Sequence, residues 1–583
     1  MKVLLSGNEA VARGAYEFGV RVAVGYPGTP STEILENIVQ YPEIYAQWSP
    51  NEKVALEMGI GASLAGARTL VTMKHVGLNV AADPLMTLAY TGVNGGLVII
   101  TADDPGMHSS QNEQDNRFFA KFAQIPLLEP ADSHEAKEMV GFGMVISESF
   151  DTPVLLRLTT RISHSKSLTW VEEDFRADLH RKPFARDPQK YVMIPAYSRK
   201  RRALINKRTE TIRDEISETT IWNSSQINDT SIGIITGGVA YQYAREVLPH
   251  ASFLKLGMSY PLPEKRIRKF AAQVEKLYVV EELTPFIEDQ VRLMGLAVEG
   301  GRSILPDTGE LSPDIVARAF GKESSRDVFN PGVAIPPRPP AMCPGCPHRG
   351  LFYTLNRKKI RAMGDIGCYT LSVMPPLEAM DMCICMGASI GAAHGFNKAI
   401  EGSDTRPVVG VIGDSTFCHS GITGLLDIAY NQGTTTVIIL DNRTTAMTGF
   451  QQHPGTGRTL KGRETRAVDL VALAKAMGIS RVEVVDPYDL AQLGQVIDQE
   501  TATAEPSLII SRRPCVLLER NAKRIQRQVD PRACTGCRMC LKLGCPAMSS
   551  GSEGKAQIDP LLCNGCPVCE QVCKAQAIKP ACA

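Results

Sequence analysis

The chain has 583 residues, a formal net charge of +1 at pH 7 and 16 cysteines. This length exceeds the roughly 250–300 residues at which a single hydrophobic core stops growing, so we expect several domains. The balanced charge provides no global field toward nucleic acid or anionic membranes. Because the sequence also lacks an apolar run of about 18 residues, we expect neither nucleic acid nor a membrane as a partner.

The first third of the sequence alternates strand-like and helix-like segments. The clearest strands and helix lie at 20–24, 51–67, 70–73 and 96–101. A further helix should begin at Ser31, whose hydroxyl can cap its first turn, and the helix over 51–67 should begin at Glu52. This βαβ rhythm is typical of a parallel sheet with helices on both faces. We therefore assign residues 1–195 to a first α/β domain.

Two further α/β domains follow, separated by polar or proline-rich stretches. Residues 196–230 are polar and charged, and we expect them to form a connector. The second domain, 231–335, has its expected strands and helix at 232–235, 241–247, 253–256 and 277–280. A boundary follows at the proline-rich stretch 336–340. The third domain, 341–515, has its clearest strand, helix and strand at 408–412, 421–431 and 437–440.

Polar residues follow two strands of the third domain. Gly413, Asp414 and Ser415 end one strand, and Asn442 ends the next. The carboxyl ends of parallel strands meet at one edge of a doubly wound sheet, where ligands bind. An aspartate carboxylate and an asparagine carbonyl suit Mg²⁺, which shares oxygen ligands with phosphates, and a glycine lets the backbone approach a diphosphate. Ordinary turn residues at strand ends are the alternative interpretation.

The spacing of these two segments resembles the thiamine-diphosphate motif, in which Gly-Asp-Gly is followed by Asn after a similar gap. Ser415 replaces the second glycine of that motif and leaves the metal ligand intact. The resemblance implies that Asp414 and Asn442 bind Mg²⁺. It also implies that the backbone carbonyl of Thr444 is the third protein ligand.

Glu52 is our candidate for the carboxylate that thiamine diphosphate needs. A glutamate hydrogen-bonded to the aminopyrimidine ring favours its imino tautomer, whose nitrogen then deprotonates C2 of the thiazolium, and a dry pocket that raises the glutamate pKa helps. Glu52 opens its expected helix and is followed by the small-residue run 59–63. The alternative is an ordinary first-turn glutamate favoured by the helix dipole.

The last 50 residues contain two cysteine runs. The first is Cys534, Cys537, Cys540 and Cys545, and the second is Cys563, Cys566, Cys569 and Cys573. Such runs wrap [4Fe–4S] clusters, and the last cysteine of each run usually ligates the other cluster. We therefore assign one cluster to Cys534, Cys537, Cys540 and Cys573, and the other to Cys563, Cys566, Cys569 and Cys545, in a ferredoxin-like domain over 525–583. A zinc ribbon is the alternative, but it supplies only two cysteines per element.

The cysteines also indicate the compartment. Metal-type spacings inside a large, glycine-rich chain favour a reducing cytosol over a disulfide framework. The apolar stretch after Lys2 is too short for a signal peptide. We therefore expect a cytoplasmic protein.

A third thiol set brackets the third domain. Cys343 and Cys346 form a Cys-x-x-Cys pair, Cys368 lies shortly after, and Cys515 lies at the far end. Because oxidation of a thiamine-bound enamine must release electrons singly to a nearby acceptor, we expect these four cysteines to hold a third [4Fe–4S] cluster close to the thiamine. Zinc, a redox pair or buried thiols packed as small apolar groups are the alternatives.

Most of the chain resembles one family, the 2-oxoacid:ferredoxin oxidoreductases. The matching stretches are 25–31, 51–52, 74–79, 108–113, 343–348, 413–420, 441–449 and the cysteine tail. The resemblance implies an α/β fold of several doubly wound thiamine-diphosphate-binding-type domains, a transketolase-C-terminal-like domain and a bacterial ferredoxin-like 2x[4Fe–4S] domain. Residues 1–195 would be the pyrimidine-binding-type domain, 231–335 the transketolase-C-like domain and 341–515 the diphosphate- and Mg²⁺-binding domain.

The resemblance also implies an activity. Aryl pyruvates such as indolepyruvate would react with coenzyme A to give aryl-acetyl-CoA and CO₂, and the released electrons would reduce ferredoxin. The segment 105–117 shows no clear equivalent of the carboxylate-binding arginine of pyruvate enzymes, which argues against pyruvate. Alternatives are a ferredoxin-linked enzyme for another 2-oxo acid, a non-redox thiamine decarboxylase, and an electron-transfer subunit whose α/β domains only dock partners.

Three more residues and one partner follow from the resemblance. Thr29 lies in the loop that matches the family's substrate-contacting Thr-Pro, so it is our candidate for the substrate carboxylate. His75 and His348 lie in matching motifs and are candidates for binding substrate or diphosphate, although a lone histidine is more often structural. Relatives that work as one long chain carry a further domain, which implies a smaller β subunit in an α₂β₂ assembly.

Overall fold

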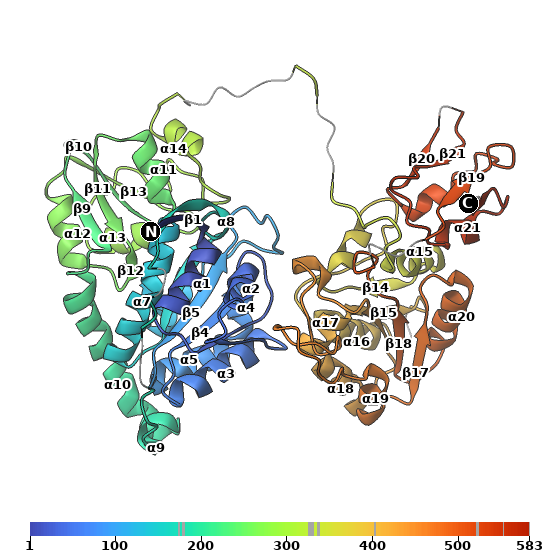
Figure 1. Cartoon of the computed structure of the whole chain (residues 1–583), viewed down its shortest axis with the longest axis horizontal. Coiled ribbons are helices and arrows are strands. Elements are labelled where there is room, and N and C mark those ends of the chain that lie inside the picture. The colour runs from blue at the N-terminus through green and yellow to red at the C-terminus, as the bar shows by residue number, and fades with distance from the viewer. Residues whose placement is uncertain are drawn as a thin grey trace. The chain divides into compact units, whose positions relative to one another are not determined.

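The computed structural model describes residues 1–172, 175–177, 181–323, 332–334, 339–401, 404–519, 524–551 and 553–581. The chain divides into two compact units, Met1–Gly332 and Val333–Ala583, and Figure 1 shows their helices and strands. The proline-rich boundary predicted at 336–340 lies largely outside the described residues. Among the helices of the described residues, none is both long and apolar enough to cross a membrane.

The first unit contains a seven-stranded sheet. Its strand order is β12 (Met258–Tyr260), β6 (Leu127–Leu128), β7 (Val154–Thr159), β5 (Leu97–Asp103), β4 (Thr69–Lys74), β2 (Val22–Gly25) and β3 (Tyr45–Trp48). All neighbouring pairs are parallel except β12 with β6. A separate antiparallel pair joins β1 (Lys2–Ser6) to β8 (Lys166–Trp170). The parallel α/β organisation expected for this region is therefore confirmed.

Helices pack around this sheet (Figure 1). They are α1 (Gly7–Glu17), α2 (Thr32–Ile38), α3 (Glu52–Leu64), α4 (His75–Val80), α5 (Ala82–Thr91), α6 (Arg117–Ala123), α7 (Ser133–Phe150) and α8 (Thr160–His164). Asn51 caps α3 by accepting a hydrogen bond from the backbone N–H of Val54 at 2.9 Å, so the predicted start at Glu52 is confirmed. The predicted end at Ala67 is too late, because α3 ends at Leu64.

The predicted cap of α2 is wrong. Ser31 has a helical backbone conformation, and its hydroxyl donates to the carbonyl oxygen of Gly28 at 2.9 Å. The backbone N–H of Gly28 in turn donates to the hydroxyl of Thr32 at 3.0 Å. The loop before the helix therefore uses both hydroxyls for its own turn, which leaves none for capping.

A second, four-stranded sheet completes the first unit. Its order is β13 (Lys276–Val280), β10 (Asp229–Gly237), β11 (Ala251–Leu256) and β9 (Asn223–Gln226), with β9 antiparallel. Its helices are α11 (Ala240–Val247), α12 (Glu264–Ala271), α13 (Phe286–Leu293) and α14 (Pro313–Ala319). The elements expected within 232–280 are confirmed. One hydrophobic core joins the two sheets, with Leu127 and Leu155 from the first and Leu254 and Leu256 from the second.

The segment expected to be a connector is largely helical. It follows α9 (Pro188–Tyr191) and consists of α10 (Pro195–Thr211), the π-helical turn η1 (Ile212–Ser217) and β9. Arg201 donates to the carbonyl oxygen of Tyr90 at 2.6 Å, and Arg208 donates to that of Asp151 at 2.7 Å. Because these arginines bind backbone carbonyls at the ends of other elements, α10 is fixed against the first sheet's helices.

The second unit is built on a five-stranded parallel sheet. Its order is β14 (Arg361–Met363), β15 (Val408–Gly413), β16 (Thr436–Asp441), β18 (Ser507–Arg512) and β17 (Arg481–Val485). Its helices are α15 (His348–Lys358), α16 (Ala388–Ile400), α17 (Asp414–Thr416), α18 (Ile422–Tyr430), α19 (Leu470–Ala476) and α20 (Leu490–Thr501), with the shorter turns η2 (Cys368–Val373), η3 (Phe417–Gly421) and η4 (Ala446–Thr448). The strand, helix and strand predicted over 408–440 are confirmed.

The cysteine tail forms small elements on the same unit. They are the antiparallel pairs β19 (Arg527–Val529) with β22 (Ile578–Pro580) and β20 (Met548–Ser550) with β21 (Ala556–Ile558), the turn η5 (Met539–Leu543) and α21 (Val568–Val572). Leu543 and Val568 of the tail share a hydrophobic core with Leu351 of α15 and Leu493 of α20. The tail is therefore packed against the α/β part of this unit rather than tethered loosely to it.

Candidate active site and thiol clusters

Asp414 and Asn442 lie at the carboxyl ends of neighbouring strands, as the sequence predicts. Asp414 follows β15 and Asn442 follows β16, and these strands pair in parallel. Both side chains are buried. The Asp414 carboxylate accepts hydrogen bonds from the backbone N–H groups of Ser415 and Arg443, each at 2.8 Å. Each carboxylate oxygen keeps a further lone pair, so the group remains able to ligate a cation.

The oxygen donors around this pair fit a hard cation. The amide oxygen of Asn442 accepts from the backbone N–H of Thr444 at 3.2 Å, which places Thr444 beside Asn442. The hydroxyl of Thr444 is buried and has no hydrogen-bond partner. A carboxylate, an amide oxygen and a neighbouring orphaned hydroxyl form the kind of donor set that Mg²⁺ uses. The hydroxyl of Ser415 is engaged elsewhere, because it accepts from Thr445 at 2.8 Å.

Two histidines flank the pair, and only one was predicted. His348, at the start of α15, has Nε2 3.3 Å from the amide nitrogen of Asn442. Burial lowers the pKa of His348 to about 4, with the Asp414 charge opposing the shift, so the imidazole is neutral at pH 7. His453 has Nε2 3.3 Å from the Asp414 carboxylate. Its position in a loop without a recognisable motif gave no signal in the sequence.

The backbone of Gly413 lies close to an aromatic ring. A Cβ at this position would lie 3.0 Å from the ring of Tyr369, and the backbone N–H of Gly413 donates to the Tyr369 hydroxyl at 2.8 Å. Tyr369 also makes an edge contact with the ring of His348. Tyr369 therefore supports both the strand end and the histidine, a role that sequence reasoning missed.

In the first unit, the predicted residues Glu52, His75 and Thr29 gather near the end of β4. Glu52 is buried, and a Cβ on Gly77 would lie 2.6 Å from its carboxylate, so this carboxylate rests against the backbone of α4. Lys74 packs its stem against Gly28, next to Thr29. The pKa of Lys74 is lowered to about 8 by burial, with the charges of Asp104 and Glu52 opposing this effect.

His75 is fully buried beside this group. Its Nε2 lies 3.2 Å from the side-chain oxygen of Asn112, and its Nδ1 has no hydrogen-bond partner. Burial and the charge of Lys74 lower its pKa, so the ring is neutral. A buried carboxylate close to an orphaned ring nitrogen provides both an acceptor and a free polar atom for an aminopyrimidine-type ligand. The sequence motif 74–79 contained Lys74, but its charge was not used in the prediction.

The third thiol set gathers beside Asn442. The backbone N–H of Cys515 donates to the carbonyl oxygen of Asn442 at 3.0 Å. Burial raises the pKa of Cys368 to about 11, and the neighbouring thiols Cys515 and Cys343 raise it further. Burial likewise raises the pKa of Cys346 to about 12, with Cys368 and Cys343 contributing. The four thiols of this set are therefore close enough to affect one another's charge.

The tail cysteines line two separate pockets. One is lined by Cys534, Cys537, Cys540 and Cys573, and the other by Cys545, Cys563, Cys566 and Cys569. These are the two groups expected from the cysteine spacing. Across the described residues, no group of three or more Cys, His, Asp or Glu side chains already has the geometry of a metal site. The grouping therefore rests on the pocket linings and on the mutual electrostatic effects of the thiols.

Comparisons with known proteins identify the family. A model described as "Pyruvate flavodoxin/ferredoxin oxidoreductase, thiamine diP-bdg" matches residues 13–229, and "Thiamine pyrophosphate enzyme, C-terminal TPP binding domain" matches 365–511. Indolepyruvate oxidoreductase subunit IorA of Archaeoglobus fulgidus is 40% identical over 622 residues, covering 100% of this chain and 98% of that protein. The chain belongs to the IorA family. The predicted membership of the 2-oxoacid:ferredoxin oxidoreductases is thereby confirmed.

Another IorA protein matches this IorA-family chain over most of its length. IorA of Pyrococcus horikoshii is 40% identical, covering 95% of this chain and 93% of that protein. Among solved structures, a 2-oxoglutarate:ferredoxin oxidoreductase from Magnetococcus marinus aligns with a TM-score of 0.45 and 16% identity, covering 55% of this chain and 65% of that one. Both matching family models are thiamine-diphosphate-binding domains, which agrees with the cofactor predicted from the Asp414–Asn442 spacing.

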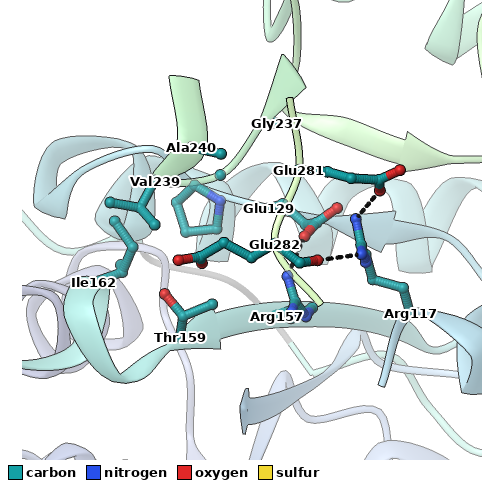
Figure 2. Close-up of a pocket in the computed structure, with 12 residues that line it drawn as sticks. Arg117, Glu129, Arg157, Thr159, Ile162, Gly237, Val239, Ala240, Glu281 and Glu282 are labelled. Atoms are coloured by element: carbon teal, nitrogen blue, oxygen red, sulfur yellow. Dashed lines mark hydrogen bonds and ion pairs between the residues drawn. The ribbon is translucent and has the colours of Figure 1, made fainter. Parts of the chain in front are cut away.

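The IorA-family chain also contains a buried polar pocket between the two sheets of its first unit (Figure 2). It is lined by Arg117, Glu129, Pro130, Arg157, Thr159, Ile162, Gly237, Gly238, Val239, Ala240, Glu281 and Glu282. Arg117 pairs with Glu281 and Arg157 pairs with Glu129, each at 2.6 Å. Burial raises the pKa values of Glu281 and Glu282 to about 7. No local motif signals this network, because its members come from distant segments.

The same pocket contains the arginine of segment 105–117. Arg117 is the arginine within the segment 105–117. It is almost fully buried and donates to Asp115 and Glu281 at 2.6 Å each. Its guanidinium is therefore committed to ion pairs within the fold.

Proposed function

We propose that this chain is the catalytic subunit of a thiamine-diphosphate-dependent enzyme that oxidatively decarboxylates indolepyruvate and similar aryl pyruvates with coenzyme A. The products are the aryl-acetyl-CoA, CO₂ and a proton, and two electrons pass to two molecules of ferredoxin. The bond between the carboxylate and the 2-oxo carbon breaks, and a thioester bond to coenzyme A forms. The 40% identity to IorA proteins over the full length of the chain supports this assignment.

The observation that carries the redox part is the contact between Cys515 and Asn442. This hydrogen bond, 3.0 Å long, joins the third thiol set to the strand edge proposed to hold the cofactor. Thiamine diphosphate supplies the carbanion chemistry at its thiazolium ring. An electron acceptor next to that site is needed because ferredoxin accepts electrons singly. A non-redox decarboxylase needs no electron acceptor at this place, and the IorA relatives are named as oxidoreductases.

The residues of the chain have distinct proposed roles. Asp414, Asn442 and the backbone carbonyl of Thr444 hold Mg²⁺ and, through it, the diphosphate. Glu52 accepts the hydrogen bond of the aminopyrimidine ring, and its burial favours that contact over water. Thr29 contacts the substrate carboxylate.

The neutral imidazoles His75 and His348 donate or accept hydrogen bonds without adding charge. Gly413 and Ser415 shape the loop that approaches the diphosphate.

Twelve cysteines are proposed as iron ligands. Cys343, Cys346, Cys368 and Cys515 form the set closest to the cofactor. The two tail sets, described above by their pockets, complete a ferredoxin-like 2x[4Fe–4S] domain over 525–583. Thiols of this kind in metal-type spacing hold clusters in a reducing cytoplasm.

Partners and domains complete the proposal. A smaller β subunit joins this chain in an α₂β₂ assembly, and ferredoxin, coenzyme A and the 2-oxo acid are the other partners. The five-part division into 1–195, 196–230, 231–335, 341–515 and 525–583 is part of the proposal. The first, third and fourth parts are the pyrimidine-binding-type, transketolase-C-like and diphosphate-binding domains.

The proposal is tested by anaerobic co-purification with the partner subunit, followed by cofactor analysis and an assay with a panel of 2-oxo acids. We expect bound thiamine diphosphate, about twelve irons per chain and ferredoxin reduction that requires both indolepyruvate and coenzyme A. About eight irons would remove the third cluster from the proposal. Release of free aldehyde without ferredoxin reduction would contradict the redox function.

A further inference from the structure

Arg349 is a buried cation for which the described residues provide no carboxylate partner. It lies on α15 and is only 2% exposed. Its guanidinium donates to the backbone carbonyl oxygens of Leu543 at 2.6 Å, Met342 at 2.8 Å and Cys343 at 3.1 Å. Its Nε is buried without a hydrogen-bond partner, and no carboxylate of the described residues forms an ion pair with it.

Other buried arginines of this chain show how unusual this is. Arg117 pairs with Asp115 and Glu281, and Arg157 pairs with Asp103 and Glu129. Burying a charge is costly unless it is paired and hydrogen-bonded. Among the residues that the structure describes, the surroundings of Arg349 supply three carbonyl dipoles but no carboxylate. A negatively charged group must therefore lie within its reach when the protein is complete.

Two thiol sets flank this guanidinium. Arg349 follows Cys346 by three residues, and its carbonyl partner Cys343 belongs to the same set. Arg349 also lines the pocket of the Cys545, Cys563, Cys566 and Cys569 set. Burial raises the pKa values of the Cys346 and Cys566 thiols, and the charge of Arg349 opposes this rise in both. Arg349 does not line the other tail pocket, which contains Cys534, Cys537, Cys540 and Cys573.

The two flanking sets are fixed relative to each other. The side-chain amide of Asn564, between Cys563 and Cys566, donates to the carbonyl oxygen of Pro344 at 2.6 Å. Gly345 leaves no room between the two loops, because a Cβ there would lie 2.0 Å from the Asn564 side chain. The hydroxyl of Tyr488 donates to the carbonyl oxygen of Gly345. Arg349 is thus held at a rigid junction of both sets.

We propose that Arg349 is the shared counter-ion of these two thiolate sets and raises the reduction potentials of the clusters they bind. The inference rests on the proposed function, in which both sets hold [4Fe–4S] clusters. A cluster with four thiolates is anionic and gains a further negative charge on reduction, so a buried cation stabilises the reduced form. Arg349 therefore acts as a positioning residue on the electron path, without touching the substrate.

The test is an anaerobic redox titration of the α–β complex, followed by electron paramagnetic resonance. Arg349→Met and Arg349→Gln remove the charge, and Arg349→Lys keeps it. Arg357→Met on the exposed side of the same helix is the matched control. A Cys537→Ala variant identifies the signal of the tail set that lies outside the reach of Arg349.

In the neutral variants, we expect the ratio of reduced to oxidised form at a fixed potential to fall by about tenfold for both flanking clusters, equivalent to about 59 mV for one electron. The cluster of the Cys534, Cys537, Cys540 and Cys573 set should keep its potential, and the Arg349→Lys and Arg357→Met variants should match the wild type. A uniform shift of all three clusters, or no shift with iron content unchanged, would overturn the counter-ion role.

If the neutral variants lose iron, the Arg349→Lys variant decides whether the charge or the shape of the side chain is required. If Arg349→Lys still loads all three clusters with wild-type potentials, the charge is the requirement and the inference stands. If the Lys variant fails like the neutral ones, the shape of arginine is the requirement and the inference falls. A wild-type complex without [4Fe–4S] signals would instead refute the proposed function itself.

Discussion

The backbone N–H of Cys515 donates to the carbonyl oxygen of Asn442 at 3.0 Å. This one contact joins the two kinds of chemistry proposed for the chain. Asn442 is a proposed ligand of the cation that holds the diphosphate, and Cys515 is a proposed ligand of iron. Because the contact is between backbone atoms, it fixes the spacing of the two backbone segments that carry these side chains.

The first prediction concerns the cation ligand. Asp414→Asn removes the carboxylate charge while preserving the side-chain shape, so binding of thiamine diphosphate with Mg²⁺ should weaken by at least about tenfold, or 1.4 kcal/mol. Equilibrium dialysis of the purified complex measures this affinity. Asp427→Asn on α18 is the control and should bind like the wild type. Unchanged affinity in the Asp414 variant would remove this residue from the proposed site.

The second prediction separates catalysis from binding. Glu52→Gln keeps the hydrogen-bonding shape but loses the carboxylate that promotes the aminopyrimidine tautomer. We expect kcat to fall by about 10²- to 10⁴-fold, with little change in thiamine diphosphate content. Glu57→Gln, on the exposed side of the same helix, should retain full activity. A loss in both variants, or in neither, would count against the role of Glu52.

The third prediction uses a buried thiol as a matched control. Cys368→Ala should lower the iron content from about twelve to about eight per chain, because one cluster loses a ligand. Cys418 is also buried in the second unit but belongs to none of the three sets. Cys418→Ala should therefore leave iron content unchanged. Equal iron loss in both variants would indicate a general effect on folding.

The fourth prediction follows from the raised pKa of Glu282. Burial raises this pKa from 4.5 to about 7. A carboxyl with a raised folded-state pKa adds stability below its unfolded pKa, and this stability is lost as the pH rises through about 7. Glu282→Gln keeps a side-chain oxygen that can accept the Leu311 backbone N–H. It should therefore stabilise the first unit at pH 8, by up to about 3 kcal/mol, and change little at pH 5.

Thermal unfolding at both pH values measures the effect of Glu282→Gln. Glu299→Gln, at an exposed position, is the control. Its stability should equal that of the wild type at each pH. Stabilisation of equal size at pH 5 and pH 8 would show that ionisation of Glu282 is not the cause.

The sequence was informative where local spacing determines the contact. Asp414 and Asn442 were predicted to meet because both follow parallel strands, and the two tail pockets contain the cysteines that their spacing grouped together. In both cases the chemistry is carried by residues within a few positions of a strand end or of one another. Such contacts follow from the periodicity and topology of the chain.

The sequence was uninformative where a contact joins distant segments. His453 reaches Asp414 from a loop, and Arg117, at the start of α6, reaches Glu281, which follows β13 of the second sheet. The cap predicted at Ser31 failed because its hydroxyl has a competing partner in the preceding turn, the carbonyl oxygen of Gly28. Hydroxyls and buried charges choose among several partners, and only the packed fold decides between them.

The most direct test is the reduction of ferredoxin by the anaerobically purified α–β complex, followed by its visible absorption during addition of indolepyruvate. We predict reduction of two ferredoxins for each CO₂ released, dependent on coenzyme A, with aryl-acetyl-CoA as the product. Release of CO₂ and free aldehyde while ferredoxin stays oxidised would contradict the account.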